Sequence, residues 1–355
     1  MAVVYKLCIY TFINTLAVGI LPLVMRFVAY AIKGLEEIAE KELLEKLGAI
    51  KVVQKGDKVI VFDYEARFEL LTKLRTADDI GVFVCPLDSL QLNNLPQVLE
   101  SIKTIRQLGN TFSITTSIAS VETDKETLIK KVSDGLSKLG LTYTPDDRSN
   151  LDFRIFLNKD IGFLAIRLTK EPLNKRNYEV GNYLGALKST IASAMVQIAT
   201  ENLPNHARIV DDFCGSGTIL CEAFLNGFPV YGGDISSEAV TLATKRLKML
   251  GSTVSENIKI QDATKTKWNA SYFDCAISNL PWDKQHEITH ITELYAKTIK
   301  EYKRILKPKF RLCIICHKPE LLVKHIKKEF GDVPIKRIDI GYLGQTPSII
   351  LASND

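Results

Sequence analysis

The chain has 355 residues, enough for two or three domains of ordinary size, and 46% of them are hydrophobic against 25% charged. This is the balance of an ordinary soluble globular protein and differs from the compositions of fibrous or disordered chains. Lysine and arginine exceed the acidic residues by 46 to 41, and the resulting net charge of +5 suits a polyanionic partner without requiring one.

The cysteines indicate reduced thiols. Most stand inside apolar runs rather than in loops, which favours a cytoplasmic protein. One stretch, "CIICH" from Cys313 to His317, matches the attachment pattern of c-type haem. We interpret it instead as the end of a buried strand, "FRLCIICH", because a helix-forming stretch follows, and we expect no haem.

The first 24 residues have two interpretations. Leu7 to Val24 is free of charge over 18 residues, which is near the minimum for a membrane span. Gly19 and Pro22 weaken this stretch as a helix. We therefore expect Met25 to be the functional start and residues 1–24 to be an upstream apolar extension, with a membrane anchor as the alternative.

From residue 25 the apolar pattern alternates between the period of a strand and that of an amphipathic helix. It predicts a first α/β unit over 25–78 and a second over 79–170, neither with a catalytic constellation. Strands are expected at 26–32, 50–54, 58–64, 80–87, 111–119, 151–158 and 161–169, and helices at 34–48, 65–74, 95–109 and 125–140.

Residues 171–185 break this periodicity with Pro172, two glycines and three asparagines, and we interpret them as a linker. Residues 186–355 then follow a strict βαβα order, which predicts a doubly wound α/β sheet. The last two strands have only a short link, so they must be antiparallel. The expected strands are 206–213, 229–235, 257–262, 273–279, 310–317, 335–343 and 348–353, and helices begin at Gly217, Ser236, Glu287 and Pro319.

Ligands of such sheets bind beyond the carboxyl ends of the strands. The first of these ends carries "DDFCGSGT", from Asp211 to Thr218. Gly215 and Gly217 allow a sharp turn and a close approach of the backbone to a ligand, and the following helix offers free N–H groups. Leu220 stands where a dinucleotide fingerprint has its third glycine, which argues against a pyrophosphate site.

Two more aspartates end the next strands. Asp234 is placed to accept hydrogen bonds from both hydroxyls of a ribose, and Asp262 to accept one from the amino group of an adenine. Any one of these aspartates could be a helix cap. Three of them at successive strand ends, beside a glycine turn, predict an adenosyl ligand.

The fourth strand ends in "SNLPW". An amine on a base is a poor nucleophile because its lone pair is delocalised into the ring, and acceptors that hold its hydrogens out of plane counter this. The side-chain carbonyl of Asn279 and the backbone carbonyl of Leu280 could be those acceptors. Pro281 stiffens the backbone, and Trp282 offers a face on which an extruded base can stack.

These motifs resemble those of S-adenosylmethionine-dependent amino-methyltransferases, through "DDFCGSGTILCEA", "GGDIS", "QDAT" and "SNLPW". The upstream "RNYEVGNYLGALKSTIASAMVQIA" is similar to the segment before the first motif in THUMP-domain RNA methyltransferases. "AIKGLEEIAEKELLEKLG" is similar to the start of their N-terminal region. Within this family the chain most resembles the tRNA guanine-N2 methyltransferases, which modify the sixth nucleotide in the acceptor stem or the tenth near the D-arm.

The resemblance implies a Rossmann-like class I methyltransferase fold for 186–355, a THUMP domain for 79–170 and a ferredoxin-like subdomain for 25–78. It implies S-adenosyl-L-methionine as cofactor and tRNA as partner, held at its 3′ end by the THUMP region. We expect a monomer without metal and without a membrane partner. The implied cofactor contacts come from Asp211, Phe213, Gly215, Gly217, Thr218, Asp234, Ile235, Asp262, Ala263 and Asn279.

Two positions depart from the family pattern. Asp212 stands where the family usually has proline, and Asp283 follows Trp282 where glycine is common. A carboxylate near the target base could add a hydrogen-bond acceptor or repel phosphate.

The leading hypothesis is methylation of the 2-amino group of a guanosine in tRNA, with position six favoured over position ten. Alternatives are the same reaction on rRNA, or methylation of DNA adenine or protein glutamine. Two further alternatives are an RNA-binding module with an inactive methyltransferase fold and a membrane-bound c-type cytochrome.

Overall fold

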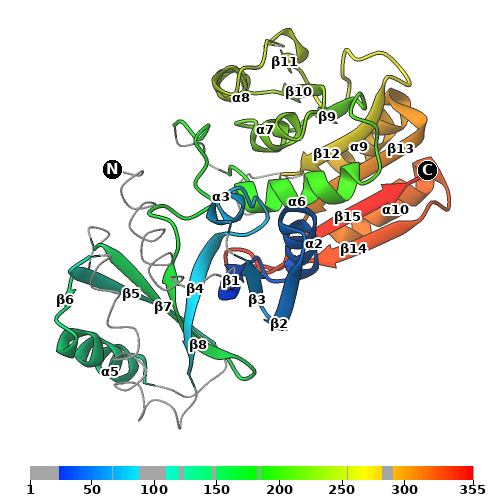
Figure 1. The fold of residues 1–355 in the computed structure, drawn as a ribbon. Helices are drawn as coiled ribbons and strands as arrows, with labels where there is room; N and C mark the ends of the chain where they lie inside the picture. The colour runs from blue at the N-terminus through cyan, green and yellow to red at the C-terminus, as the bar shows by residue number, and fades with distance from the viewer. Residues whose placement is uncertain are drawn as a thin grey trace. The chain divides into compact units, whose positions relative to one another are not determined.

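The computed structural model describes residues 24–65, 67–87, 109–119, 124–145, 149–181, 183, 185–253, 255–281 and 291–354. The chain divides into two compact units (Figure 1). The N-terminal unit holds the residues up to Ala31 and those from Ala39 to Leu173, and the C-terminal unit holds Ile32–Ile38 and everything from Asn174 onward.

The described strands of the N-terminal unit form one sheet in the order β2-β3-β1-β4-β8-β7-β5-β6. All neighbours are antiparallel except β5, which runs parallel to β6 and β7. The β1–β4 pairing, with Phe27 opposite Val82, continues the sheet across the two α/β units expected from the sequence. The strands are β1 (Val24–Tyr30), β2 (Ile50–Gly56), β3 (Val59–Glu65), β4 (Asp79–Pro86), β5 (Thr111–Ile118), β6 (Thr142–Tyr143), β7 (Leu151–Leu157) and β8 (Gly162–Arg167), and the helices are α2 (Glu36–Leu47), α3 (Phe68–Leu71) and α5 (Lys125–Lys138).

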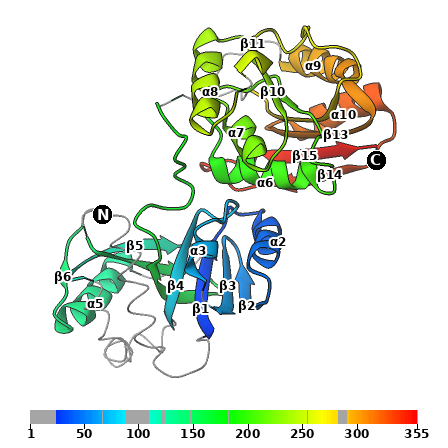
Figure 2. The ribbon, with the colours of Figure 1, turned by 45° about the horizontal axis from the view of Figure 1, so that its top comes forward.

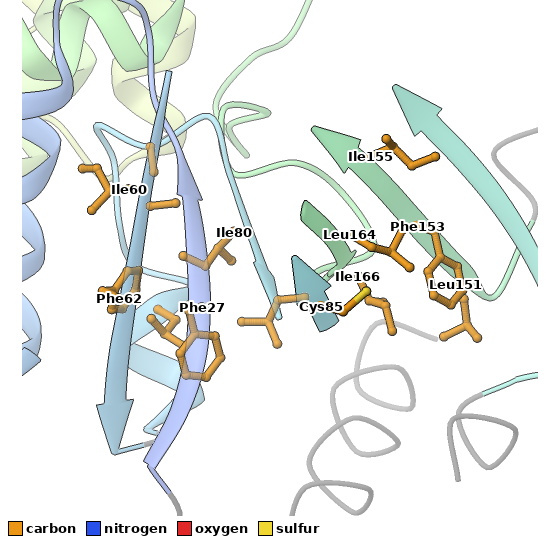
Figure 3. Packing of buried hydrophobic residues seen from close by; sticks show 14 of the residues in the cluster. Phe27, Ile60, Phe62, Ile80, Cys85, Leu151, Phe153, Ile155, Leu164 and Ile166 are labelled. Atoms are coloured by element: carbon orange, nitrogen blue, oxygen red, sulfur yellow. The ribbon is translucent and has the colours of Figure 1, made fainter. Parts of the chain in front are cut away.

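Each face of this sheet carries a cluster of buried residues, and successive residues of a strand contribute to opposite clusters. Ile60 and Phe62 of β3 join the larger core together with Phe27 and Phe153 (Figure 3). Val59 and Val61 of the same strand join a smaller core on the other face. There the rings of Phe156 and Phe163 stack at 5.2 Å.

Helix α3 is shorter than the helix expected over 65–74, and a buried carboxylate explains its end. Glu42 of α2 is 1% exposed and accepts hydrogen bonds from the backbone N–H groups of Arg75 and Thr76 at 2.8 to 2.9 Å. It also accepts the Thr76 hydroxyl at 2.6 Å and pairs with Lys46 at 2.6 Å. The N–H groups that would extend α3 are thus bound to a side chain instead. The helix expected at 95–109 lies almost entirely outside the described residues.

The C-terminal unit is built on a sheet in the order β11-β10-β9-β12-β13-β15-β14. The first five strands are parallel, and β15 runs antiparallel to both β13 and β14. This confirms the predicted doubly wound sheet with its antiparallel C-terminal hairpin. The strands are β9 (Ile209–Asp211), β10 (Val230–Asp234), β11 (Ile258–Ile260), β12 (Phe273–Asn279), β13 (Leu306–Cys316), β14 (Ile335–Asp339) and β15 (Ser348–Ser353), and the helices are α6 (Ser189–Thr200), α7 (Thr218–Leu225), α8 (Ser237–Met249), α9 (Ile291–Ile305) and α10 (Pro319–Phe330), with a 3₁₀ turn η3 at Ser255–Asn257.

Helices cover both faces of this sheet (Figure 2). Cys313 and Ile315 of β13 pack in one core with α6, α7 and α8. Leu312, Ile314 and Cys316 of the same strand pack in the other core with α9 and α10. The strand predicted at "CIICH" is therefore present inside the sheet, between β12 and β15, with both of its cysteines buried.

Part of the segment expected to be a linker packs into the C-terminal unit. Arg176 and Tyr178 are both buried and bind the carboxylate of Glu222 in α7, at 3.1 and 2.6 Å. Ile32 and Leu35 belong to the same core as α7. Gly34 between them has a φ of +92°, and a Cβ there would collide with the carbonyl oxygen of Asp339.

No helix among the described residues is long and apolar enough to cross a membrane. The apolar stretch that ends at Val24 lies outside the described residues except for Val24 itself.

We expect Glu42→Ala to lower the free energy of unfolding by at least about 1–3 kcal/mol, because it leaves two buried backbone donors without an acceptor. Glu45→Ala on the same helix removes an exposed carboxylate 3.8 Å from Lys41 and should cost less than about 0.5 kcal/mol. Urea unfolding of the full chain measures both. Equal effects of the two substitutions would show that the Glu42 network does not stabilise the fold.

Candidate active site

The candidate site lies at the carboxyl edge of the C-terminal sheet, where the strand order reverses. Strand β9 pairs with β10 on one side and with β12 on the other. The chain adds β10 and β11 on the first side, and then returns to add β12 and β13 on the second side. Doubly wound sheets bind their ligands at this switch point. Asp211, Asp234 and Asn279 are the last residues of β9, β10 and β12.

The glycine turn after β9 has the conformation that its sequence predicts. Gly215 and Gly217 have φ values of +49° and +83°, which favour glycine. A Cβ on Gly217 would approach Ala243 of α8 to 2.8 Å, so this glycine lets two helices meet. A Cβ on Gly215 would meet nothing nearer than the ring of Tyr183 at 3.5 Å. The backbone at Gly215 therefore borders open space that a ligand can enter.

Asp234 fixes this turn. One of its carboxylate oxygens accepts the N–H of Gly215 and the other accepts the N–H of Ser236, both at 2.9 Å. A carboxylate has about four lone-pair sites, so both oxygens can still accept hydroxyl hydrogens. Asp234 is only partly buried, which leaves it within reach of a ligand.

Asp211 is buried and ties β9 to β12. Its Oδ1 accepts the hydroxyl of Ser278 at 2.7 Å and the N–H of Phe213 at 3.1 Å. The Ser278 hydroxyl is also 2.7 Å from the hydroxyl of Tyr302. Burial raises the pKa of Asp211 to about 8, against the effect of these hydrogen bonds, and the neighbouring carboxyl groups of Asp212 and Asp234 add to the rise.

Asp212 is buried and binds residues of the segment that follows β11. It is 1% exposed, and its Oδ1 accepts hydrogen bonds from Trp268 Nε1 at 2.8 Å and from Gln261 Nε2 at 2.9 Å. Burial raises the pKa of Asp212 to about 7. A carboxylate buried in this way neither adds an acceptor for a target base nor repels a phosphate. Asp283, the other departure from the family pattern, lies outside the described residues.

Two exposed isoleucines and an exposed aspartate lie near the ends of β10 and β11. Ile235 is 75% exposed, and Ile260, which pairs with Asp234 across the two strands, is 57% exposed. Asp262 is exposed and accepts both the N–H and the hydroxyl of Thr264, at 2.8 and 2.7 Å, while Ala263 is buried. Two exposed isoleucines beside a half-buried carboxylate suit a ligand that has both a sugar and an apolar ring.

The fourth strand brings Asn279 to the far side of the switch point. Asn279 is partly buried and follows Ser278, whose hydroxyl binds Asp211. The next residue, Leu280, is buried, and its N–H donates to the carbonyl of Ile315 at 3.2 Å. This bond fixes the backbone where the turn begins. Pro281 is partly buried, and Trp282 lies outside the described residues.

The remaining predicted residues belong to the same turn. Phe213 is partly buried against the core of α9 and α10, and Thr218 is buried as the first residue of α7. Sequence reasoning did not predict the residues that bind the buried side of this turn, because no local pattern links them to the two aspartates. These residues are Ser278 and Tyr302, which act on Asp211, and Gln261 and Trp268, which act on Asp212.

The residues present fit an S-adenosyl group. The open side of Gly215 suits the amino-acid part of this group, and the remaining lone pairs of Asp234 suit the hydroxyls of its ribose. The exposed isoleucines suit its adenine ring. The partly buried carboxylate of Asp234 at this edge gives an electrostatic environment that favours a sulfonium cation. No group of three or more potential metal ligands occurs among the described residues.

Comparison with known proteins identifies the class of this domain. Residues 176–345 match a family model described as "RMKL-like, methyltransferase domain". This match supports S-adenosylmethionine as the cofactor. It does not reach the N-terminal unit, so the THUMP assignment of residues 79–170 stays a prediction.

The similar proteins are consistent with this match. A protein named "Putative RNA methyltransferase YpsC" from Bacillus subtilis (strain 168) is 29% identical over 230 residues, which are 59% of this chain and 57% of that protein. The chain thus matches just over half of that relative's length.

Two solved structures resemble the whole chain. TrmN from Thermus thermophilus has a TM-score of 0.80 and 20% identity, over 93% of this chain and all of that one. The structure of SMU.472, described as a putative methyltransferase complexed with SAH, has a TM-score of 0.74 and 18% identity, over 94% of this chain and 98% of that one. At these identities the likeness concerns the fold, and it confirms the predicted Rossmann-like class I fold.

The two buried carboxyl groups predict a pH dependence of stability. In an unfolded chain an aspartate has a pKa of about 3.9, whereas burial raises the pKa of Asp212 to about 7 and that of Asp211 to about 8. Between these values the folded protein binds more protons, so the free energy of unfolding should fall as the pH rises from 5 to 8.5. Asp211→Asn should flatten this fall, and Asp262→Asn, at an exposed position, should not. Urea unfolding across this pH range measures the slopes, and a wild-type slope in the Asp211 variant would contradict the assignment.

Proposed function

We propose that the protein transfers a methyl group from S-adenosylmethionine to the exocyclic 2-amino group of a guanosine in tRNA, with position six of the acceptor stem favoured and position ten second. The observation that carries this proposal is Asn279 at the switch point, on a strand that Ser278 ties to Asp211 in the cofactor turn. An amide oxygen beside a cofactor site suits an amino group as the acceptor of methylation.

The chain's own residues would act on the amino group. Asn279 Oδ1 and the Leu280 carbonyl would accept hydrogen bonds from its two N–H groups and leave the nitrogen lone pair available for attack. The bond from Leu280 N–H to Ile315 would hold this backbone in place, and Pro281 would restrict it further. Trp282 would stack on the extruded base. The cofactor supplies an electrophilic methyl group on a sulfonium.

A structured RNA is the substrate class that the chain's other features support. The likeness to TrmN extends over 93% of this chain, so it includes the N-terminal unit. The relative from Bacillus subtilis bears the name "Putative RNA methyltransferase YpsC". In this proposal the N-terminal unit is a THUMP-containing region that holds the 3′ end of the tRNA, and the protein acts as a cytoplasmic monomer.

We expect Asn279→Ala to lower the rate of methyl transfer by at least about 100-fold and to leave tRNA binding nearly intact, because the lost contact is strongest in the transition state. Single-turnover methylation with saturating tRNA measures the rate. Asn257→Ala serves as control, since the amide of Asn257 binds the Val230 carbonyl away from this edge. Methylation at the wild-type rate by the Asn279 variant would refute its catalytic role.

The substrate itself is tested by mass mapping of nucleosides in tRNA, rRNA and DNA from a strain that lacks the gene. Loss of N2-methylguanosine from tRNA is the expected result. Loss from rRNA, or loss of N6-methyladenine from DNA, would replace the proposed substrate. Unchanged nucleosides would leave a protein-amide substrate or a non-catalytic RNA-binding role.

We expect Asp234→Ala to weaken the binding of S-adenosylmethionine at least tenfold, because charge-assisted hydrogen bonds to the ribose contribute about 1.5–3 kcal/mol each. The substitution also frees the Gly215 N–H, which can add to the loss. Titration calorimetry of the full chain measures the affinity. Glu238→Ala, in the first turn of α8, should bind as wild type does, and unchanged affinity in the Asp234 variant would overturn the ribose contact.

A further inference from the structure

Asp212 carries a carboxylate oxygen for which the described part of the chain offers no hydrogen-bond partner. Its Oδ2 is buried and unbonded, while its Oδ1 accepts hydrogen bonds from both Trp268 and Gln261. Burial of a carboxyl group with half of its acceptor capacity unused is costly. The two hydrogen bonds that Asp212 Oδ1 accepts must therefore contribute enough to offset this cost.

Both donors come from the loop that follows β11. Gln261 is the first residue after this strand, and its N–H donates to the Asp234 carbonyl at 3.0 Å. Its side-chain Oε1 accepts the N–H of Lys267 at 3.2 Å, so the same amide binds Asp212 at one end and the loop's own backbone at the other. Trp268 closes the loop with its bond to Asp212. Asp262 and Ala263, the expected adenine contacts, lie between these two attachments.

The residues around Asp212, Gln261 and Trp268 are closely packed. A Cβ on Gly233 of β10 would lie 2.8 Å from both Asp212 Oδ1 and Gln261 Nε2, so the Asp212–Gln261 contact needs glycine there. The indole of Trp268 is 7% exposed and packs edge-on against Tyr231 and Phe273 with ring centroids 5.9 and 5.5 Å away. The Asp212–Gln261–Trp268 cluster is therefore built as a unit with Gly233.

We propose that Asp212 is a positioning residue for the cofactor's adenine. Through Gln261 and Trp268 it fixes the loop at 261–268, and thereby holds Asp262 and Ala263 beside the Asp234 end of the crevice. This inference rests on the proposed function in one respect, namely that the crevice binds an S-adenosyl group. In this role the cluster acts on cofactor affinity, through the loop that carries Asp262 and Ala263.

The first test measures the binding of S-adenosylhomocysteine by titration calorimetry with the full chain. We expect Asp212→Ala to weaken binding more than tenfold, and Asp212→Asn to stay within about threefold, because the amide oxygen can still accept both hydrogen bonds. Trp268→Phe keeps an aromatic ring against Tyr231 but removes the donor, and should weaken binding several-fold. Asp274→Asn is the matched control, because it alters a hydrogen-bonded carboxylate next to Arg208 and Lys307 on the same sheet, and it should bind as wild type does.

A second measurement separates positioning from general stabilisation. The chain has two tryptophans, so an ¹⁵N-labelled protein gives two indole N–H resonances, and Trp268→Phe identifies one of them. This resonance should move on addition of S-adenosylhomocysteine, and in Asp212→Ala it should move before any ligand is added. In turnover assays, Asp212→Ala should raise the KM for S-adenosylmethionine at least tenfold with kcat within about threefold.

The outcomes are distinct. If the wild type binds S-adenosylhomocysteine, and Asp212→Ala and Trp268→Phe both bind it with wild-type affinity, the positioning role is overturned and the proposed function stands. If Asp212→Ala does not fold, Asp212→Asn and Trp268→Phe carry the test alone, and unchanged affinity in Trp268→Phe overturns the role. If the wild type does not bind S-adenosylhomocysteine, the proposed function and this inference both fail.

Discussion

Two adjacent buried carboxyl groups at the end of β9 hold the crevice of the C-terminal unit together. Asp211 and Asp212 follow one another in the chain, and their side chains bind different neighbours. Asp211 binds Ser278 on β12, and Asp212 binds the loop that follows β11. The glycine turn that begins between them is thus fastened to both sides of the switch point, so neither side can shift without breaking a buried hydrogen bond.

The same burial that makes these carboxyl groups costly gives the site its electrostatic character. Removal of an aspartate from water disfavours its charged form, which is why the pKa values of Asp211 and Asp212 rise. A cationic ligand nearby would favour the charged form, so its binding would release protons from these groups and would become tighter as the pH rises. A sulfonium cofactor is such a cation, whereas the pyrophosphate of a dinucleotide is an anion.

The C-terminal unit is assembled from two separate parts of the chain. Ile32 and Leu35 reach its core from a segment that interrupts the N-terminal unit, and Tyr178 reaches it from the segment before α6. Arg176 and Tyr178 satisfy the buried carboxylate of Glu222, so this segment is part of the α7 packing. A domain boundary drawn after this segment would remove the bonds that Arg176 and Tyr178 make to that buried carboxylate.

The sequence by itself determined the fold class and most of the element order, and it pointed to the strand ends at which the candidate site lies. Period-two and period-3.6 patterns are local properties, and β12 and β15 have the predicted bounds for that reason. The glycine turn and the aspartates at strand ends were also readable, because parallel strands bring their carboxyl ends to one edge. Only the tertiary structure decided which polar groups are paired. Glu42 ends α3 from another helix, Asp212 binds a tryptophan 56 residues away, and the segment before α6 is buried by α7. Such pairings depend on distances between elements that are remote in the chain, and no local pattern of residues encodes those distances.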